Sequence, residues 1–336
     1  MTYVILVNYN GWQDTIQCLE SILVSSITNF KVIVIDNHSI DDSFTKLSLW
    51  AKNKGEIVSP LLNTNDQDTL FVSVNSELND NETCWDVVII RSDVNNGFAA
   101  GNNTGVRFIQ KNELDYDNIW LLNNDTIIDF EALENYVRRM KYEVQMKSNV
   151  GILGGKLLFH HDRSILQGIG GNYNKFIAAA KPIGWNQKDT NQYEEKDVKF
   201  DYVIGASMFV NKSFINEVGL MKEDYFLYFE ELDWTLRGRK KGWKIGYEPT
   251  VKVYHKESAS TTGDCGISLI ADKYQLRNRI VFTYRFYPIL LLTVLPVTFI
   301  SVFNRIIRKQ YKRSWQLLVL IFITICQLKK WKDDEE

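Results

Sequence analysis

The chain has 336 residues, of which 45% are hydrophobic and 24% are charged, and its formal net charge at pH 7 is −2. This composition is typical of a globular protein with enough apolar material for a full core. A nearly neutral chain has no general field that attracts nucleic acid, so we predict no nucleic-acid partner. The four cysteines are scattered and form no C-x-x-C pair, which favours free thiols in a reducing compartment. No charged and then apolar leader precedes Val4, so we expect no secretory signal.

The first part of the chain alternates between short apolar runs and segments with helical periodicity. This alternation predicts an α/β fold with a central, mostly parallel sheet that helices cover on both faces. The expected strands are residues 3–7, 31–35, 86–90 and 118–122, and the expected helices are residues 13–23, 99–110 and a segment that begins at Asp42 or Ser43 and runs toward Trp50.

The remaining segments are less regular. Residues 53–84 read as a long surface insertion with a small hairpin near residues 70–74, and the glycine-rich residues 151–201 read as irregular. Further along the chain we expect strands at residues 203–210, 243–246 and 250–254, and helices at residues 212–218, 230–241 and 268–284.

The C-terminal tail has a different composition. Residues 286–303 carry no charge, residues 305–313 hold five basic side chains, and residues 315–328 are again apolar. The first run reaches the lower limit for crossing a bilayer and the second falls short of it. A spanning hairpin would also place the basic loop outside the cell. We therefore favour two interfacial helices at a membrane surface over a spanning hairpin, and over a soluble helix pair packed on the core or on another subunit.

Four polar clusters follow the four predicted parallel strands. They are Asn8-Tyr9-Asn10, Asp36-Asn37-His38-Ser39, Asn95-Asn96-Gly97-Phe98 and Asn123-Asn124-Asp125-Thr126. Ligands of open α/β sheets bind beyond the carboxyl ends of the strands, so these clusters predict one site. The chain lacks Gly-x-Gly-x-x-Gly after the first strand and has no P-loop motif, which argues against a dinucleotide-binding protein and excludes a P-loop nucleotidase.

At this point the sequence resembles family 2 of the glycosyltransferases, which have the GT-A nucleotide-sugar fold, and within it the rhamnosyltransferase-like branch. The resemblance runs from about residue 2 to residue 285. The matching stretches are VILVNYNG (4–11), VIDN (34–37), NGFAAGNN (96–103), LLNNDT (121–126), GAS (205–207), YFEELDWTLR (228–237) and YH (254–255). It implies a donor-binding half at residues 1–127 and an acceptor-binding and catalytic half of the same domain at residues 128–285. Residues 286–336 lie outside the resemblance and form the predicted membrane-associating helical tail.

The resemblance implies a metal site for Mg²⁺ or Mn²⁺, either of which would neutralise the leaving diphosphate. The family carries an Asp-x-Asp-like motif after the fourth strand, and this chain has Asn123-Asn124-Asp125 there. Asp125 is then the anionic ligand, and Asn123 offers only a neutral carbonyl oxygen. His255 matches a histidine that completes the metal site in related enzymes. A loop histidine hydrogen-bonded to backbone is the alternative.

The resemblance also implies an inverting reaction, in which a base deprotonates the acceptor hydroxyl. Glu231 matches the family's base, with Glu230 and Asp233 as alternatives that would position the acceptor. Three acidic groups are tolerated at this predicted helix start because they face the positive end of the helix dipole.

Nucleotide contacts follow from the same resemblance. Tyr9, with its neighbours Asn8 and Asn10, is expected against the base, and Asp36 is expected to accept the imide N–H of thymine or uracil. Asn37 and Asn124 belong to the same strand-end clusters. Asn102 stands where many relatives have arginine and is expected to hydrogen-bond the nucleotide. Asn103 is expected to brace its loop, and Gly97 permits close approach of the backbone.

The expected function is transfer of a sugar, with L-rhamnose from a thymidine-diphosphate donor as the leading candidate and a uridine-diphosphate donor as an alternative. The expected acceptor is a saccharide or lipid-linked saccharide in cell-surface polysaccharide synthesis, at the cytoplasmic face of the cell membrane. A homo-oligomer stays open. The alternatives are a nucleotidyltransferase, disfavoured because residues 8–11 hold no Lys or Arg, and a non-catalytic sugar-binding descendant, suggested by Asn123.

Overall fold

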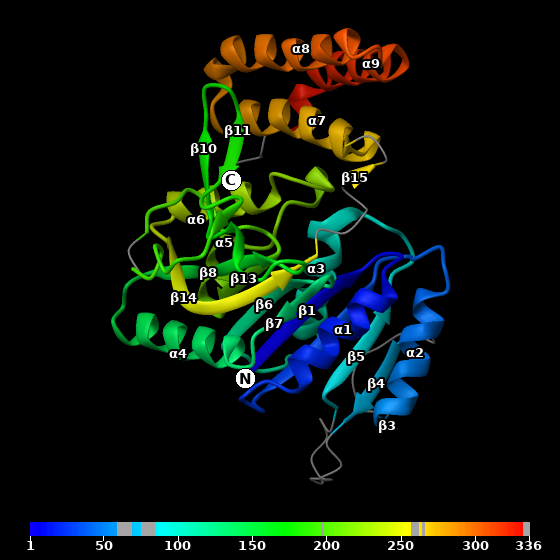
Figure 1. The fold of residues 1–336 in the computed structure, drawn as a ribbon, viewed down its shortest axis with the longest axis vertical. Coiled ribbons are helices and arrows are strands. Elements are labelled where there is room, and N and C mark those ends of the chain that lie inside the picture. The colour runs from blue at the N-terminus through cyan, green and yellow to red at the C-terminus, as the bar shows by residue number, and fades with distance from the viewer. Residues whose placement is uncertain (59–68, 75–84, 196–197, 257–261, 264–265, 332–336) are drawn as a thin grey trace.

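A computed structural model describes residues 1–58, 69–74, 85–195, 198–256, 262–263 and 266–331. One large sheet runs through the structure in the order β12-β9-β8-β13-β6-β1-β2-β5-β4-β3, and β14 pairs with β7 and β8 (Figure 1). Its strands are β1 (Thr2–Asn8), β2 (Phe30–Asp36), β3 (Glu56–Val58), β4 (Thr69–Ser73), β5 (Val87–Arg91), β6 (Asn118–Asn123), β7 (Thr126–Ile128), β8 (Val150–Phe159), β9 (Ile165–Gly168), β12 (Gln187–Lys188), β13 (Ser207–Asn211) and β14 (Lys244–His255). The strand pairs β10 (Gly171–Asn174) with β11 (Ala179–Pro182), and β15 (Thr262–Gly263) with β16 (Gly266–Ile267), are separate.

The predicted mostly parallel centre is confirmed, since β5, β2, β1 and β6 are parallel neighbours and antiparallel strands extend the sheet on both sides. The helices are α1 (Trp12–Leu23), α2 (Ser43–Lys54), α3 (Gly97–Lys111), α4 (Ala132–Gln145), α5 (Lys212–Val218), α6 (Glu230–Lys240), α7 (Leu269–Phe286), α8 (Leu291–Ile307) and α9 (Tyr311–Cys326), with 3₁₀ turns at η1 (Glu223–Tyr225), η2 (Pro288–Leu290) and η3 (Leu328–Trp331).

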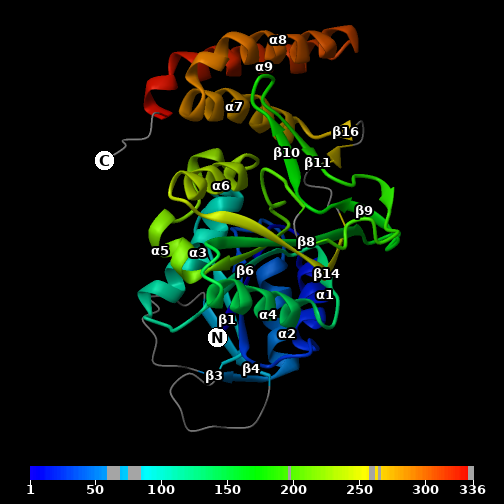
Figure 2. The same cartoon turned by 90° about the vertical axis from the view of Figure 1, so that its left-hand side faces the viewer.

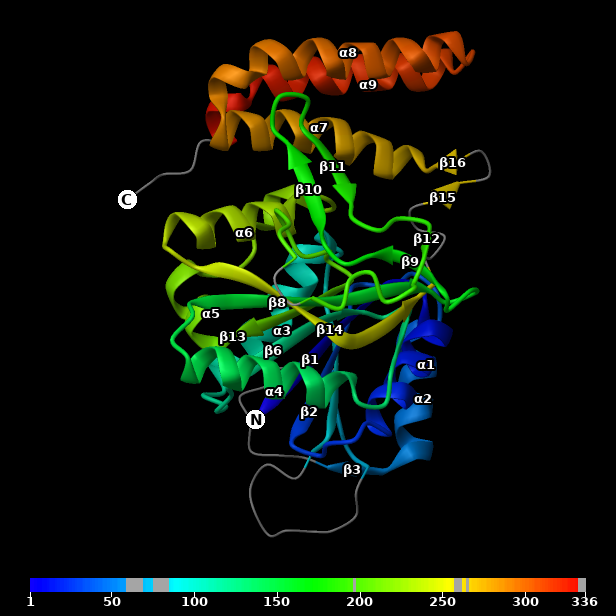
Figure 3. The same ribbon diagram turned by 60° about the vertical axis from the view of Figure 1, so that its left-hand side comes forward.

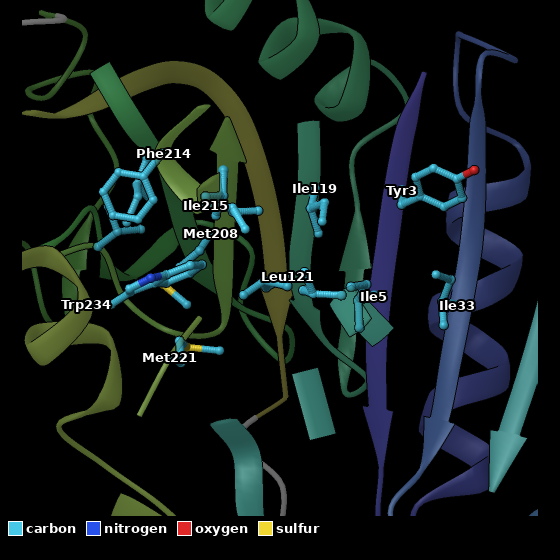
Figure 4. Close-up of a cluster of buried hydrophobic side chains, with 14 of the residues drawn as sticks. Tyr3, Ile5, Ile33, Ile119, Leu121, Met208, Phe214, Ile215, Met221 and Trp234 are labelled. Atoms are coloured by element: carbon cyan, nitrogen blue, oxygen red, sulfur yellow. The ribbon is translucent and has the colours of Figure 1, made fainter. Parts of the chain in front are cut away.

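The central strands are apolar throughout because both faces of the sheet are buried. Tyr3 and Ile5 of β1 belong to a buried cluster on one face that also includes side chains of α3, α5 and α6, and Figure 4 shows both residues together with Trp234 of α6. Val4 and Leu6 point to the opposite face, where α1, α2 and α4 cover them. Side chains alternate between faces along a strand, so a continuous apolar run is what a doubly covered strand requires.

The expected hairpin of the 53–84 insertion is present as two strands. β3 and β4 pair antiparallel, and β4 joins the sheet beside β5. The other parts of this insertion, residues 59–68 and 75–84, lie outside the described residues, as do Cys84 and Cys265. Cys18 and Cys326 are free thiols, as expected.

The expectation that residues 151–201 are irregular was wrong. This segment holds most of β8, a ten-residue strand, together with β9 to β12. The two short strands expected at residues 243–246 and 250–254 are one strand, β14, which has a register shift between Tyr247 and Lys252. Such a bulge interrupts the strand pattern in the sequence while the pairing continues on either side of it. Helix α4 was not predicted.

The tail forms a separate helical layer. Helices α8 and α9 lie side by side above α7, and the β10–β11 hairpin rises to meet them (Figures 2 and 3). The Thr293 hydroxyl of α8 donates a hydrogen bond to the Phe176 carbonyl at the hairpin tip. Among the described residues one helix, Pro288–Ile307, is long and apolar enough to cross a membrane, judged by length and composition alone.

A buried acidic residue attaches this layer to the rest of the structure. Asp272 of α7 is buried, and its carboxylate accepts hydrogen bonds from Arg305 of α8 and from Arg313 of α9, each with a guanidinium nitrogen at 2.7 Å. One carboxylate therefore holds two helices through charge-assisted hydrogen bonds.

We predict that Asp272→Ala destabilises the protein by about 3–5 kcal/mol, because it leaves two largely buried arginines without their partner. Chemical denaturation of the two proteins measures the difference. The matched control is Asp115→Ala, which removes an exposed ion pair with Lys212 and is expected to cost about 1 kcal/mol or less. Equal effects of the two substitutions would contradict this prediction.

Candidate active site

The carboxyl ends of three central strands meet at one edge of the sheet. Asn8 at the end of β1 is in register with Asp36 at the end of β2, and Val7 is in register with Asn123 at the end of β6. The residues after these strands are therefore neighbours in space, as the sequence analysis expected.

A buried network fixes the first two strand ends. The Asn8 amide donates to Asp36 Oδ1 at 2.7 Å and to Ser39 Oγ at 3.1 Å, and Thr15 Oγ1 donates to Asn8 Oδ1 at 2.8 Å. Asn8 thus supports Asp36 from behind. Asp36 is fully buried, yet its Oδ2 has no hydrogen-bond partner among the described residues, and the nearest cation, Arg91 Nε, lies 4.0 Å away. A buried acceptor without a partner is costly unless a ligand supplies the donor.

The loops after β1 and β2 are joined to each other. Asn10 has a left-handed backbone (φ 53°), its N–H donates to Ser39 Oγ, and its side-chain oxygen accepts the Ile40 N–H. Tyr9 projects beside them with 43% of its surface exposed, so its ring is open to a planar ligand.

Asn37 and Asn124 act within the protein. The Asn37 amide donates to Asn95 Oδ1 at 3.0 Å and to the Gly97 carbonyl at 3.1 Å, which joins the β2 loop to the start of α3. The Asn124 amide donates to Thr15 Oγ1 at 2.9 Å and so joins β6 to α1. Gly97 needs its glycine, because φ is 90° and a Cβ there would lie 2.1 Å from the Phe226 carbonyl oxygen.

The two asparagines of α3 are buried and face away from open space. The Asn102 amide donates to the Phe98 carbonyl one turn earlier. The Asn103 side chain donates to the Met221 carbonyl and to Glu223, and accepts the Met221 N–H. Asn103 braces the segment before the acidic helix.

Three proposed metal ligands converge. His255 Nε2 lies 3.1 Å from Asp125 Oδ1 and 3.3 Å from the Asn123 amide nitrogen. This convergence arises because β14 pairs antiparallel with β7, which places His255 opposite Thr126. Gln167 of β9 completes the group, with its Oε1 2.8 Å from His255 Nδ1 and its amide donating to the His255 carbonyl at 3.2 Å. Gln167 was not predicted, because it lies in the segment that was expected to be irregular.

The hydrogen bonds of Gln167 define the histidine tautomer. Its amide nitrogen is occupied by a carbonyl, so its oxygen faces Nδ1 and accepts the Nδ1 proton. Nε2 then directs a lone pair at the Asp125 carboxylate, and two electron-rich atoms at 3.1 Å need a cation between them or a proton on the ring. Rotation of the Asn123 amide would add an oxygen ligand. Among the described residues no group of three or more His, Cys, Asp or Glu side chains could hold a metal ion, and at this place Asn123 accompanies only two such side chains, Asp125 and His255. The donor set of carboxylate, amide oxygen and imidazole fits Mg²⁺ or Mn²⁺, with Mn²⁺ accepting the nitrogen ligand more readily.

The acidic residues at the start of α6 differ sharply in environment. Asp233 is fully buried, and its carboxylate accepts hydrogen bonds from Arg237 Nε at 2.6 Å, Arg285 Nη1 at 3.2 Å and the Tyr225 hydroxyl at 2.9 Å. These contacts occupy the carboxylate and give Asp233 a structural role. Glu230 is buried, and its Oε2 has no partner among the described residues. Glu231 is partly exposed, and its carboxyl carbon lies 4.0 Å from the position of a Cβ on Gly205. Of the three, Glu231 is the one that a substrate can reach.

Burial raises the pKa of Glu231 to about 7, and it raises the pKa of Glu230 well above its usual range with a further contribution from the charge of Glu231. A carboxyl group with a pKa near neutrality both holds and releases a proton at physiological pH.

A strained loop precedes the acidic helix. Phe226, Tyr228 and Phe229 all have positive φ, which is rare for large side chains. The Asn278 amide of α7, fully buried, lies within hydrogen-bond distance of the carbonyls of Tyr225 (2.9 Å), Leu227 (2.8 Å) and Tyr228 (3.0 Å). Asn278 therefore holds the loop that orients Glu231. No signal in the sequence identified it.

No protein-family profile matches the chain. The chain is 25% identical over 177 residues to the low-salt glycan biosynthesis hexosyltransferase Agl10 of Haloferax volcanii, a match that covers 53% of this chain and 54% of that protein. It is 23% identical over 210 residues to the dTDP-rhamnosyl transferase RfbF of Shigella flexneri, covering 61% of this chain and 66% of that one. Over 91 residues it is 34% identical to the N-acetylglucosaminyl-diphospho-decaprenol L-rhamnosyltransferase of Mycobacterium tuberculosis, covering 27% of this chain and 24% of the relative. The matches thus span between a quarter and two thirds of these relatives.

Two solved structures share the fold. GalNAc-T7, solved with UDP, GalNAc and Mn²⁺, superposes with a TM-score of 0.56 at 14% identity, over 84% of this chain and 47% of that one. The mannosyltransferase PcManGT from Pyrobaculum calidifontis, solved with GDP-Man and Mn²⁺, superposes with a TM-score of 0.52 at 12% identity, over 100% of this chain and 88% of that one. The chain therefore has the GT-A glycosyltransferase fold, and its resemblance to rhamnosyltransferase-like glycosyltransferases is confirmed.

Proposed function

We propose that this chain is a metal-dependent, inverting glycosyltransferase that uses a nucleotide-diphosphate sugar. The observation that carries the proposal is the convergence of His255 on Asp125 and Asn123 at the sheet edge that also holds Asp36. One edge thereby combines a buried acceptor for a nucleobase with a donor set for a divalent cation. The relatives named as hexosyltransferase and rhamnosyl transferases support the same activity.

The donor is held by residues of the strand ends. Asp36 Oδ2 accepts the imide N–H of a pyrimidine, which satisfies the buried oxygen that has no partner among the described residues. Tyr9 covers the base with its exposed ring. Asp125, His255 and Asn123 would hold Mg²⁺ or Mn²⁺, which when bound neutralises negative charge on the diphosphate leaving group.

Glu231 is the proposed base. Its carboxylate takes the proton of the acceptor hydroxyl while that oxygen bonds to the anomeric carbon. The bond between the anomeric carbon and the diphosphate oxygen breaks, and its electron pair leaves with the nucleoside diphosphate. A single displacement of this kind inverts the anomeric configuration. Asp233 positions the helix through its arginine pairs, and the charge of Glu231 helps to raise the pKa of buried Glu230.

The proposed donor is a thymidine-diphosphate sugar with L-rhamnose, supported by the relative named as a dTDP-rhamnosyl transferase. The proposed acceptor is a lipid-linked saccharide, supported by the relative named for a diphospho-decaprenol substrate and by the apolar tail. The site would act at the cytoplasmic face of a membrane in cell-surface polysaccharide synthesis.

We expect the purified protein to release nucleoside diphosphate slowly from a single donor in a panel of nucleotide sugars that includes dTDP-rhamnose and the UDP-sugars. Release should require Mg²⁺ or Mn²⁺ and fall by at least about a hundredfold with EDTA or in Asp125→Ala. The matched control is Asp129→Ala, which lies directly after β7 and is not one of the proposed metal ligands. Release that survives EDTA would remove the metal from the mechanism. An absence of both release and donor binding would favour a non-catalytic descendant.

The pKa of Glu231 sets a pH dependence. The base works only when ionised, so kcat/KM should fall about tenfold per pH unit below pH 7 and level off above it. Glu231→Gln should reduce kcat by about 10²–10⁴-fold and remove this dependence. Glu131→Gln, an exposed residue before α4, serves as the control. If Glu230→Gln, and not Glu231→Gln, removes the dependence, the base is assigned to the wrong residue.

We also propose that the tail lies on the membrane surface. α9 buries Leu317 and Ile321 against α7 and α8 but leaves Trp315 and Phe322 each 69% exposed on its other side. α8 likewise exposes Leu292, Phe299, Phe303 and Ile307. A helix that is apolar on all sides requires a second apolar partner. Arg308, Lys309 and Lys312 lie at the turn between the two helices, which favours an anionic lipid surface as that partner.

The full chain should therefore float with vesicles that contain anionic phospholipid, and less so with zwitterionic vesicles. The double substitution Trp315→Ser/Phe322→Ser should abolish most of this binding, because each exposed aromatic contributes about 1.5–3 kcal/mol when buried in lipid. Trp185→Ser, an exposed tryptophan away from the tail, is the matched control. Retention of binding by the double variant would contradict the proposal. A stable dimer that fails to bind vesicles would also contradict it, because α8 and α9 of one copy would then be covered by α8 and α9 of the other copy.

A further inference from the structure

A cavity of about 900 Å³ lies between the catalytic part of the chain and the tail. Its wall includes Asp224 and Phe226 of the loop before α6, Lys273, Tyr274 and Arg277 of α7, and Leu320 of α9. Helix α7 is the layer that separates the sheet from α8 and α9 in Figures 1 and 3. The cavity thus connects the two parts of the molecule.

One end of the cavity adjoins the catalytic loop. The Phe226 ring stacks on Tyr274 with centroids 4.6 Å apart, and the Phe226 carbonyl accepts the Phe98 N–H at 2.8 Å. A Cβ on Gly205 would lie 3.7 Å from the Phe98 ring and 4.0 Å from the Glu231 carboxyl carbon. Phe226 of the cavity wall is therefore joined through Phe98 to the surroundings of the proposed base, Glu231.

The charges of the cavity wall favour an anion. Lys273 makes no ion pair with any described residue. Arg277 donates hydrogen bonds to the Asp224 carbonyl at 2.9 Å and to Asn278 Oδ1 at 2.6 Å, and its guanidinium lies 4.3 Å from the centroid of the Trp331 ring. The two carboxylates of the wall are already paired, Asp224 with Arg285 at 2.7 Å and Glu223 with Arg107 at 2.5 Å. Among the described residues, neither of these two cations, which lie at positions i and i+4 on one face of α7, is in an ion pair with a carboxylate, so both can add an anionic ligand.

Part of the cavity wall is apolar. Ile270 of α7, 59% exposed, and Leu320 of α9 belong to this wall, and α9 also carries exposed apolar side chains. An occupant that matches both the basic and the apolar parts of the wall has an anionic group next to a long apolar chain. A nucleotide would match the cations but not this apolar wall, and a neutral lipid would leave Lys273 without a partner.

We propose that this cavity binds the phosphate or diphosphate group of a lipid-linked acceptor, with Lys273 and Arg277 as its ligands. Its apolar chain then runs along α9 and its sugar faces Glu231. The inference rests on the proposed glycosyltransferase function and specifies the acceptor class of that site. It also explains why two basic residues face a cavity beneath an apolar tail.

The test measures binding of farnesyl diphosphate to the full chain by calorimetry, in detergent and with EDTA so that the proposed metal site does not contribute. Inorganic diphosphate and farnesol are the parallel probes. We expect farnesyl diphosphate to bind at least tenfold more tightly than either, and Lys273→Gln to weaken its binding about tenfold. Lys141→Gln, an exposed lysine of α4 on the opposite side of the fold, should leave binding unchanged.

Equal binding by Lys273→Gln and the unsubstituted chain would overturn the proposal. If inorganic diphosphate binds as tightly as farnesyl diphosphate, the cavity is a site for free phosphate groups. If farnesol binds as tightly, the cavity is an apolar site alone. Either result also overturns the proposal. Nucleoside diphosphate release from the donor, measured on the same variants without acceptor, should be the same in Lys273→Gln. If the unsubstituted chain releases no nucleoside diphosphate from any donor but still binds farnesyl diphosphate, the result counts against the transferase function and not against this cavity.

Discussion

The pairing of β14 with β7 is the contact on which the candidate site depends. It places His255 opposite Thr126 and so brings an imidazole to the carboxylate of Asp125. β14 also runs parallel to β8, whose neighbour β9 supplies Gln167 to the other ring nitrogen. One side chain thereby joins the segment that follows β6 to the second half of the sheet. Because Gln167 accepts the Nδ1 proton and donates to the His255 carbonyl, the orientation of the imidazole is fixed before any ligand binds.

Helix α7 has a comparable role on the opposite side of the acidic helix. Its Asn278 amide contacts three carbonyls of the loop at residues 225–229, in which three residues have positive φ, and its Arg285 binds Asp224 and Asp233. Residues with positive φ and large side chains cost about 1–3 kcal/mol each, so the loop needs such support. The same helix holds α8 and α9 through Asp272. The geometry around Glu231 and the attachment of the tail therefore depend on a single helix.

The sequence predicted the first half of the fold well because local and tertiary constraints agree there. The apolar runs that become β1, β2, β5 and β6 are buried on both faces, so their composition identifies them directly. β8 was missed because Gly151 and Gly155 read as chain breakers. In the structure they are glycines because Phe214 and Val251 pack against them, and a Cβ would lie 2.2 and 2.7 Å from those side chains. Close packing of this kind leaves no local pattern.

In the candidate site, too, the residues that belong to motifs were predicted and those outside motifs were not. Asp125, Asn123 and His255 were proposed together from motifs more than 100 residues apart, and the structure places them in contact. Gln167 and Asn278 act through single hydrogen-bonding groups on elements with no motif, and only the fold identifies them. Asp233 carries the same charge as Glu231, but two arginines from α6 and α7 occupy it, and this pairing depends on the position of α7.

The central claim is that His255 Nε2 and Asp125 hold one divalent cation next to the donor site. Electron–nuclear double resonance on Mn²⁺ bound to the protein with nucleoside diphosphate measures this directly. We expect a ¹⁴N coupling from one directly bound imidazole and a ³¹P coupling from the diphosphate, and we expect the ¹⁴N signal to be absent in His255→Ala. A ³¹P coupling without any histidine nitrogen in the unsubstituted protein would place the cation elsewhere and contradict the account.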